Sequence, residues 1–172
     1  SFAPGRSLVD AVHDLMQRIF HEFTYDPEFS TVATPLKEVL EHRSGVCQDF
    51  AHLGIACLRS LGLAARYVSG YIETVPPPGQ TKQPGSDESH AWFSVYLPDV
   101  GWHDFDPTNN TMPEDRHVTA AVGRDFGDVT PVKGVLYTEE QDEFRDLLKK
   151  TTFCFSIVSF KASSFIKPSI KT

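Results

Sequence analysis

The sequence predicts an α+β domain in which N-terminal helices pack against an antiparallel β-sheet. Residues 6–23 and 47–61 both repeat apolar side chains with the spacing of a helix that is buried on one face. Residues 89–97 instead alternate between two faces, as a half-buried strand does. Because a short turn connects this strand to residues 101–106, the two strands are expected to be antiparallel neighbours.

The composition is that of a globular protein and excludes several functional classes. The chain has 172 residues, 40% of them hydrophobic and 23% charged, which is enough for one domain with a real core. A net charge of -7 argues against nucleic-acid binding, because it leaves no surplus of Lys and Arg to neutralise phosphates. No apolar run approaches membrane-spanning length, and no signal peptide opens the chain.

The cysteine pattern favours a reducing compartment. Three cysteines cannot all pair, and they lack the Cys-x-x-Cys spacing of a zinc ribbon or a disulfide framework. We therefore expect a cytoplasmic protein.

Residues 6–23 form the clearest helix, with Ser7 as its N-cap. The apolar stripe of this helix consists of Leu8, Val9, Val12, Leu15, Met16, Ile19, Phe20 and Phe23. A shorter helix is expected over residues 34–42, where a Thr-Pro pair fits the N-cap and the first helical position.

The next helix begins almost at once after Gly45 and places Cys47 at its first or second position. Its buried face carries Phe50, Leu53, Gly54, Cys57, Leu58 and Leu61, and Gly62 fits its C-terminal stop. A thiol at a helix start lies against unsatisfied backbone N–H groups and the positive end of the helix dipole, which stabilises the nucleophilic thiolate. Position alone leaves open that Cys47 is one more small buried apolar residue.

The second half of the chain has the composition of strands. Residues 64–74 are β-branched and aromatic, with an interruption at Gly70. Residues 76–87 form a loop rich in Pro, Gly and polar residues, which is either functional or a tolerated surface insertion. Residues 117–122 could form another short strand.

The parity of the hairpin decides whether His90 and Asp106 can meet. With a turn of two or four residues, the two side chains would lie on opposite faces of the sheet. With a three-residue turn, Leu97 pairs with Gly101, and His90 lies diagonal to Asp106 on one face. Diagonal neighbours are roughly 7–8 Å apart at Cα, within side-chain reach. A catalytic role for both residues therefore requires a three-residue turn or an equivalent bulge.

Three motifs carry a specific resemblance to a known family. They are residues 43–53 around Cys47, residues 88–92 around His90 and residues 101–108 around Asp106. A cysteine nucleophile needs an imidazole to accept its proton and a third group to orient that ring. The motifs resemble those of the transglutaminase-like superfamily, in particular bacterial transglutaminase-like cysteine peptidases.

The resemblance covers roughly residues 5–137 and implies a papain-like fold. It also implies that Cys47 is the nucleophile, His90 the general base and Asp106 the third member of a catalytic triad. Residues 124–126 and 128–134 resemble the closing segment of bacterial members.

We expect a core domain at residues 1–137 and a divergent C-terminal tail at residues 138–172. Bacterial relatives usually continue from the core with a glycine-rich turn and a further strand. This chain does not, and residues 153–160 are the candidate replacement for that strand. The chain begins with Ser1 rather than Met, and relatives often carry a β-rich region ahead of the core, so we interpret it as a fragment of a longer protein.

The implied activity is acyl transfer or hydrolysis on an amide of a protein or peptide substrate, without a cofactor. The Cys47 thiolate would attack the carbonyl, and His90 would take the thiol proton and later protonate the leaving amine. The Cys47 backbone N–H could supply one oxyanion donor, and Gln48 and Trp102 are both candidates for the second. Water as acceptor gives a protease or amidase and an amine gives a transglutaminase, and the residues leave both open.

The sequence also allows two alternatives. A metal site could draw on His52, His90, His103, Asp104 and Asp106. Strand alternation sends His103 to the face opposite the two aspartates, so we expect no metal. The second alternative is an interaction module that keeps the fold and has lost its activity. Neither nucleic acid nor a membrane is an expected partner.

Overall fold

The computed structural model describes residues 1–75, 78–79 and 88–130. Several expectations from the sequence fall outside these residues. They are the tail at 138–172 and its boundary at 137, the candidate strand at 153–160, residues 131–134 of the closing segment and most of the loop at 76–87; the third cysteine, Cys154, also lies there.

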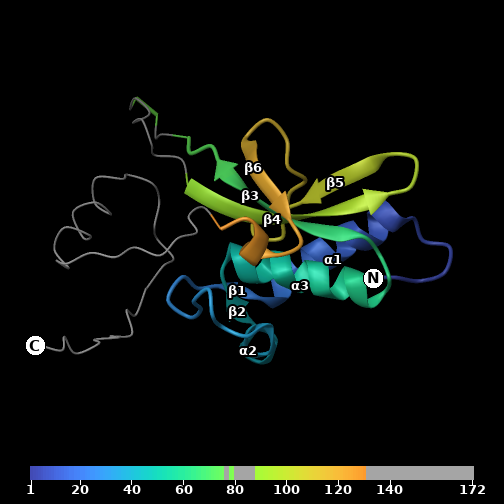
Figure 1. Ribbon diagram of the computed structural model, residues 1–172, viewed down its shortest axis with the longest axis horizontal. Coiled ribbons are helices and arrows are strands. Elements are labelled where there is room, and N and C mark those ends of the chain that lie inside the picture. The colour runs from blue at the N-terminus through green and yellow to red at the C-terminus, as the bar shows by residue number, and fades with distance from the viewer. Residues whose placement is uncertain (76–77, 80–87, 131–172) are drawn as a thin grey trace, which may run out of the picture.

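The described chain places helices on one side of a four-stranded antiparallel sheet, which confirms the predicted α+β class (Figure 1). The helices are α1 (Leu8–Glu22), α2 (Leu36–His42) and α3 (Cys47–Ser60). The strands lie in the order β5 (Gly101–Phe105), β4 (Glu88–Leu97), β3 (Ala65–Ile72) and β6 (His117–Gly123). Helix α3 lies directly against β3 and β4, and α2 packs on α3. None of the helices in the described ranges has the length and apolarity to cross a membrane.

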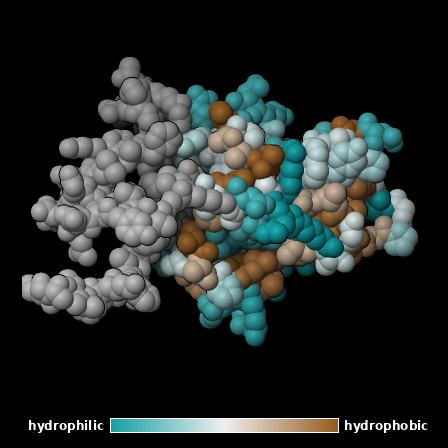
Figure 2. Space-filling model, viewed as in Figure 1, coloured by the Kyte–Doolittle hydropathy of each residue, from teal (hydrophilic) through white to brown (hydrophobic). Residues whose placement is uncertain are grey.

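Helix α1 begins where the sequence predicts it. The Ser7 hydroxyl accepts a hydrogen bond from the Asp10 backbone N–H at 3.1 Å and caps the helix. The stripe that packs into the core is narrower than predicted, because Val9 and Phe20 at its edges are exposed. Exposed apolar side chains are ordinary on a protein surface, and Figure 2 shows hydrophobic residues between hydrophilic ones on the face in view.

The segment before α3 differs from the prediction in detail. Helix α2 ends at His42, as the sequence predicts, and Arg43, in the left-handed region with φ +52°, is its C-cap. Residues 44–45 then form a short strand, β2 (Ser44–Gly45), which pairs in parallel with β1 (Thr24–Tyr25). This pair, which the sequence did not reveal, ties the chain after α1 to the turn that precedes α3.

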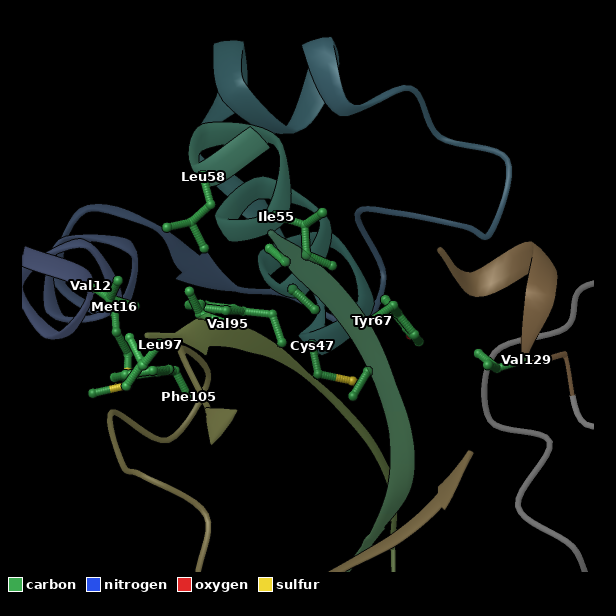
Figure 3. Close-up of a cluster of buried hydrophobic side chains, with 14 residues drawn as sticks. Val12, Met16, Cys47, Ile55, Leu58, Tyr67, Val95, Leu97, Phe105 and Val129 are labelled. Atoms are coloured by element: carbon green, nitrogen blue, oxygen red, sulfur yellow. The ribbon is translucent and has the colours of Figure 1, made fainter. Parts of the chain in front are cut away.

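The core lies between α3 and the sheet, with α1 closing one end (Figure 3). Helix α3 approaches β4 closely at Gly54, where a Cβ would lie 2.5 Å from the Phe93 ring. The main buried cluster includes Val12, Met16, Cys47, Ala51, Ile55, Leu58, Tyr67, Phe93, Val95 and Phe105. Cys47 is therefore part of the hydrophobic core as well as the first residue of α3.

The β4–β5 hairpin has the register that the sequence analysis required. Leu97 pairs with Gly101, which leaves a three-residue turn at 98–100. Phe93 pairs with Phe105, and their rings stack at 5.8 Å. This register places the residue after β5, Asp106, on the same face of the sheet as His90.

Gly70 allows three strands to converge beside the hairpin. A Cβ at this position would lie 2.2 Å from the Val118 carbonyl oxygen and 2.6 Å from the Trp92 ring. The predicted strand at 117–122 is present as β6, and its register with β3 shifts next to Gly70. Gly70 therefore lets the start of β6 approach β3 and β4.

We predict that Gly70→Ala destabilises the domain by about 1–3 kcal/mol, because the added methyl meets backbone that cannot move without separating β3 from β6. Urea unfolding measures the change, with Ser69→Ala on the same strand as the control. A free energy of unfolding within about 0.5 kcal/mol of the wild type would contradict the close approach.

Candidate active site

Three separate segments bring Cys47, His90 and Asp106 together. Cys47 opens α3, His90 lies near the start of β4, and Asp106 directly follows β5. The Asp106 backbone N–H donates to the Thr111 carbonyl at 2.8 Å and the Thr111 N–H donates back at 3.2 Å, which closes the loop after the strand. The candidate nucleophile, base and carboxylate thus meet at the junction of the helical layer and the sheet.

His90 and Asp106 form a buried hydrogen-bonded pair. His90 Nε2 lies 2.8 Å from Asp106 Oδ2, and the two side chains are 8% and 0% exposed. A carboxylate only accepts, so Nε2 carries the proton of this hydrogen bond. The other ring nitrogen, Nδ1, is then free to accept the Cys47 thiol proton. This is the tautomer that a cysteine nucleophile requires.

Electrostatics favours a charged pair. Burial lowers the pKa of His90, but hydrogen bonds to Asp106 and Cys47, together with their charges, outweigh it and raise that pKa to about 10. For Asp106, burial raises the pKa, but hydrogen bonds from His90, Asn109 and His117 and the charge of His90 hold it below its ordinary value. The Cys47 side chain is thus close enough to act on the imidazole.

The Asp106 carboxylate has further donors. Its Oδ1 accepts from the Thr108 backbone N–H at 2.9 Å and from the Asn109 N–H at 3.2 Å. Its Oδ2 also accepts from Asn109 Nδ2 at 2.7 Å and from His117 Nε2 at 3.0 Å. Asn109 and His117 were not among the residues predicted from the sequence. Asn109 lies within the Asp106 motif, but nothing in the local pattern pointed to His117.

Asp49 fixes the turn in front of the thiol. Its Oδ2 accepts from the Val46 backbone N–H at 2.9 Å and from the Ser30 hydroxyl. A Cβ at Gly45 would lie 2.8 Å from the same oxygen, so only glycine leaves room for it. Asp49 was not predicted either, although an acidic residue at the third helical position is a known signal for capping.

The two candidate oxyanion donors lie in different places. Gln48 follows Cys47 in the first turn of α3 and lines a pocket of about 310 Å³ together with Asp49 and His52. Trp102 pairs with Tyr96 across the hairpin, six residues along β4 from His90, or about 20 Å.

The structure therefore does not bring Trp102 to the site. Its ring instead lies under the Arg66 guanidinium at 4.2 Å.

The ligand types considered for a metal do not cluster as a group. His52 Nε2 accepts from the Phe126 backbone N–H at 3.2 Å, and His103 pairs with Val95 on the face opposite Asp104. Trp92 Nε1 donates to Asp104 at 3.0 Å.

A different set does converge. His90, Asp106 and His117 each offer one atom of ligand type, all within 4.8 Å of one another. Both imidazoles already use Nε2 to donate to the carboxylate, so we interpret this set as a hydrogen-bond network.

Comparison with known proteins gives relatives that agree with the resemblance seen in the sequence motifs. The sequence model of the transglutaminase-like superfamily matches residues 3–107. An uncharacterised protein of Mycobacterium tuberculosis is 46% identical over 151 residues, which cover 86% of this chain and 48% of the relative. A Pseudomonas aeruginosa protein named protein-glutamine gamma-glutamyltransferase is 34% identical over 105 residues, covering 58% of this chain and 16% of its own length.

A crystal structure from Cytophaga hutchinsonii, provisionally assigned as a cysteine protease, superposes with a TM-score of 0.61 at 31% identity. The match covers 74% of this chain and 40% of that one. The chain spans about half the length of the mycobacterial relatives that it matches.

We predict that iodoacetamide labels Cys47 ahead of Cys57. Cys57 is the more exposed of the two, but burial raises its pKa, whereas Cys47 has His90 beside it. His90→Ala should slow Cys47 labelling about tenfold or more, and His103→Ala on the neighbouring strand should not. Mass spectrometry after brief treatment near neutral pH gives both rates. Earlier labelling of Cys57, or a Cys47 rate indifferent to His90, would rule out an activated thiol.

The charged pair also predicts a pH dependence of stability. Because the pKa of His90 is raised, its contribution to the free energy of unfolding is complete below its ordinary value of 6.5 and is lost as the pH rises towards about 10. The pKa of Asp106 is lowered, so its contribution is present above its ordinary value of 3.8 and is lost in more acidic solution. The pair should stabilise the domain most between about pH 4 and 6.5.

Urea unfolding of the wild type and His90→Gln at about pH 5.5, 7.5 and 9.5 tests this expectation. The advantage of the wild type should shrink as the pH rises. A difference that stays constant over this range would show that the two residues do not titrate as a charged pair.

Proposed function

The chain belongs to the transglutaminase-like superfamily, and on that premise we propose that it catalyses cysteine-dependent acyl transfer or hydrolysis on amide groups of proteins or peptides. One observation carries the proposal. Cys47, His90 and Asp106 come from three distant segments, and the His90 imidazole contacts Asp106 through Nε2 while the Cys47 side chain acts on the same ring. This arrangement can make a nucleophile, move a proton and hold the ring that moves it.

In the proposed reaction, His90 first takes the proton of the Cys47 thiol. The thiolate sulfur then forms a bond to the amide carbon, and the carbonyl electron pair moves to the oxygen. When the carbonyl re-forms, the C–N bond breaks, and the His90 imidazolium gives its proton to the leaving amine. The product of this step is an acyl group held as a thioester on Cys47.

The second half of the reaction reverses these roles. An incoming water or amine loses a proton to His90 as it attacks the thioester, and the acyl group leaves the Cys47 sulfur. Asp106 keeps the proton on His90 Nε2 throughout and balances the charge of the imidazolium.

Stabilisation of the oxyanion is proposed to come from the start of α3. The first intrahelical hydrogen bond runs from the Phe50 N–H to the Val46 carbonyl, so the N–H of Cys47 lies in the turn that has no intrahelical acceptor. This N–H can donate to the developing oxyanion, and Gln48 remains the side-chain candidate for a second donor.

Water and an amine are both consistent as acceptors with the names of the relatives. The Pseudomonas relative carries the name of a glutamine γ-glutamyltransferase, and the Cytophaga structure is provisionally a cysteine protease. The shared proposal is therefore a thioester on Cys47, with water or an amine as acceptor. A cytoplasmic location also remains a proposal.

We predict that purified protein incorporates a fluorescent primary amine into a glutamine-containing peptide library, or releases ammonia or peptide fragments from it. Cys47→Ala should abolish both signals, because no thioester can form. Asp106→Asn should lower turnover about a hundredfold or more, because the amide can hold the wrong imidazole tautomer. The ratio of amine incorporation to ammonia release identifies the acceptor.

His103→Ala is the matched control for a histidine substitution on the sheet outside the network. Circular dichroism confirms that each variant is folded. Full activity in Cys47→Ala would refute the proposal. Folded wild type without activity, and with a thiol that does not respond to His90, would favour the interaction module.

A further inference from the structure

A second histidine reaches the Asp106 carboxylate from the far edge of the sheet. His117 is the first residue of β6, and its Nε2 lies 3.0 Å from Asp106 Oδ2. Its side chain is 5% exposed, so this contact is shielded from water. The same oxygen accepts from His90 at 2.8 Å, which means that two imidazoles share one carboxylate oxygen.

The surrounding structure holds the His117 ring in place. The ring meets Trp92 edge to face, with centroids 5.2 Å apart and planes at 86°. Trp92 is itself fixed by the hydrogen bond from its Nε1 to Asp104. The missing Cβ of Gly70 lets both the Trp92 ring and the start of β6 approach β3. A histidine that only filled space would not need its Nε2 at hydrogen-bond distance from a buried charge.

Only one of the two groups in this contact can be the hydrogen-bond donor. The Asp106 carboxylate only accepts, so His117 Nε2 carries a proton and donates it. Such a donor favours the ionised carboxylate and restricts its rotation about the Cβ–Cγ bond. Because Asp106 in turn fixes the tautomer of His90, a change at His117 would reach the thiol through two hydrogen bonds without touching it.

We propose that His117 is a positioning residue that holds Asp106 ionised and oriented so that His90 can activate Cys47. This inference rests on the proposed function. The groups that face Asp106 are His90 from β4, His117 from β6 and Asn109 from its own loop, and Cys47 acts on it through His90. His117 therefore has a direct hydrogen bond to the Asp106 carboxylate, whose ionisation sets the pH range in which His90 can activate Cys47.

The test compares His117→Leu with His117→Gln. Leucine fills much of the space but donates nothing, whereas the glutamine amide can place an N–H close to the position of the imidazole Nε2. His103→Leu is the matched control, because this half-buried histidine lies on β5 facing away from Asp106. The readouts are turnover on the peptide library and the rate of Cys47 alkylation from about pH 5 to 9.

We expect His117→Leu to lower turnover about tenfold or more and to move the acid limb of the Cys47 alkylation profile to higher pH. The direction follows because the lost donor lets Asp106 take up a proton at higher pH, after which it no longer stabilises the imidazolium. The loss should therefore be larger at pH 5 than at pH 8. His117→Gln should restore the profile, and His103→Leu should leave it unchanged.

Two results would overturn the inference. One is an alkylation profile in folded His117→Leu that coincides with the wild type. The other is a uniform loss at every pH that glutamine does not restore, which is the signature of a packing role. If His117→Leu does not fold, His117→Asn gives the same comparison, because its shorter amide cannot reach the carboxylate from β6.

His90→Ala separates the two proposals. If Cys47 in the wild type reacts no faster than in His90→Ala, the proposed function fails. If that difference is present and the profile of His117→Leu matches the wild type, only the role of His117 fails.

Discussion

The fully buried Asp106 carboxylate is the constraint on which the rest of the site depends. A buried charge without partners costs several kcal/mol, so the fold must bring donors to it from wherever they lie in the chain. Five hydrogen bonds do so, from His90, His117, the Thr108 backbone and the backbone and side chain of Asn109. The hairpin, the loop after β5 and the edge strand β6 converge on this one group, and the imidazole beside the thiol is held as a consequence.

The parts of the site that obey local periodicity could be predicted from the sequence. Helical spacing placed Cys47 at the start of a buried helix, and the structure has α3 begin there. The period of two along strands showed that His90 and Asp106 share a face only with a three-residue turn, and the hairpin has that turn. Parity assigns faces but not positions along a strand. Trp102 lies on the same face as His90 but several residue pairs away from it, so the face alone could not exclude it as a candidate.

The missed residues depend on features without a periodic signal. His117 reaches Asp106 because the pairing of β3 with β6 shifts register beside Gly70. No local sequence pattern indicates such a shift. The β1–β2 pair is only two residues long, which is too short to show alternation. Asp49 was closer to prediction, because its place in the first turn of α3 is a capping position, but its partner Ser30 belongs to a distant loop.

Cys47 belongs at once to the hydrophobic core and to the candidate active site, since it is 7% exposed and packs in the same cluster as Val12, Ile55 and Leu58. The candidate nucleophile therefore has no separate scaffold that could be exchanged while the core is kept. Substitutions that repack α3 against the sheet will move the sulfur relative to His90, so evolutionary drift in these interior positions is restricted by chemistry as well as by stability. Exposed positions of α2 and the outer face of α1 are free of this restriction, because side chains there do not pack into the cluster that holds the sulfur.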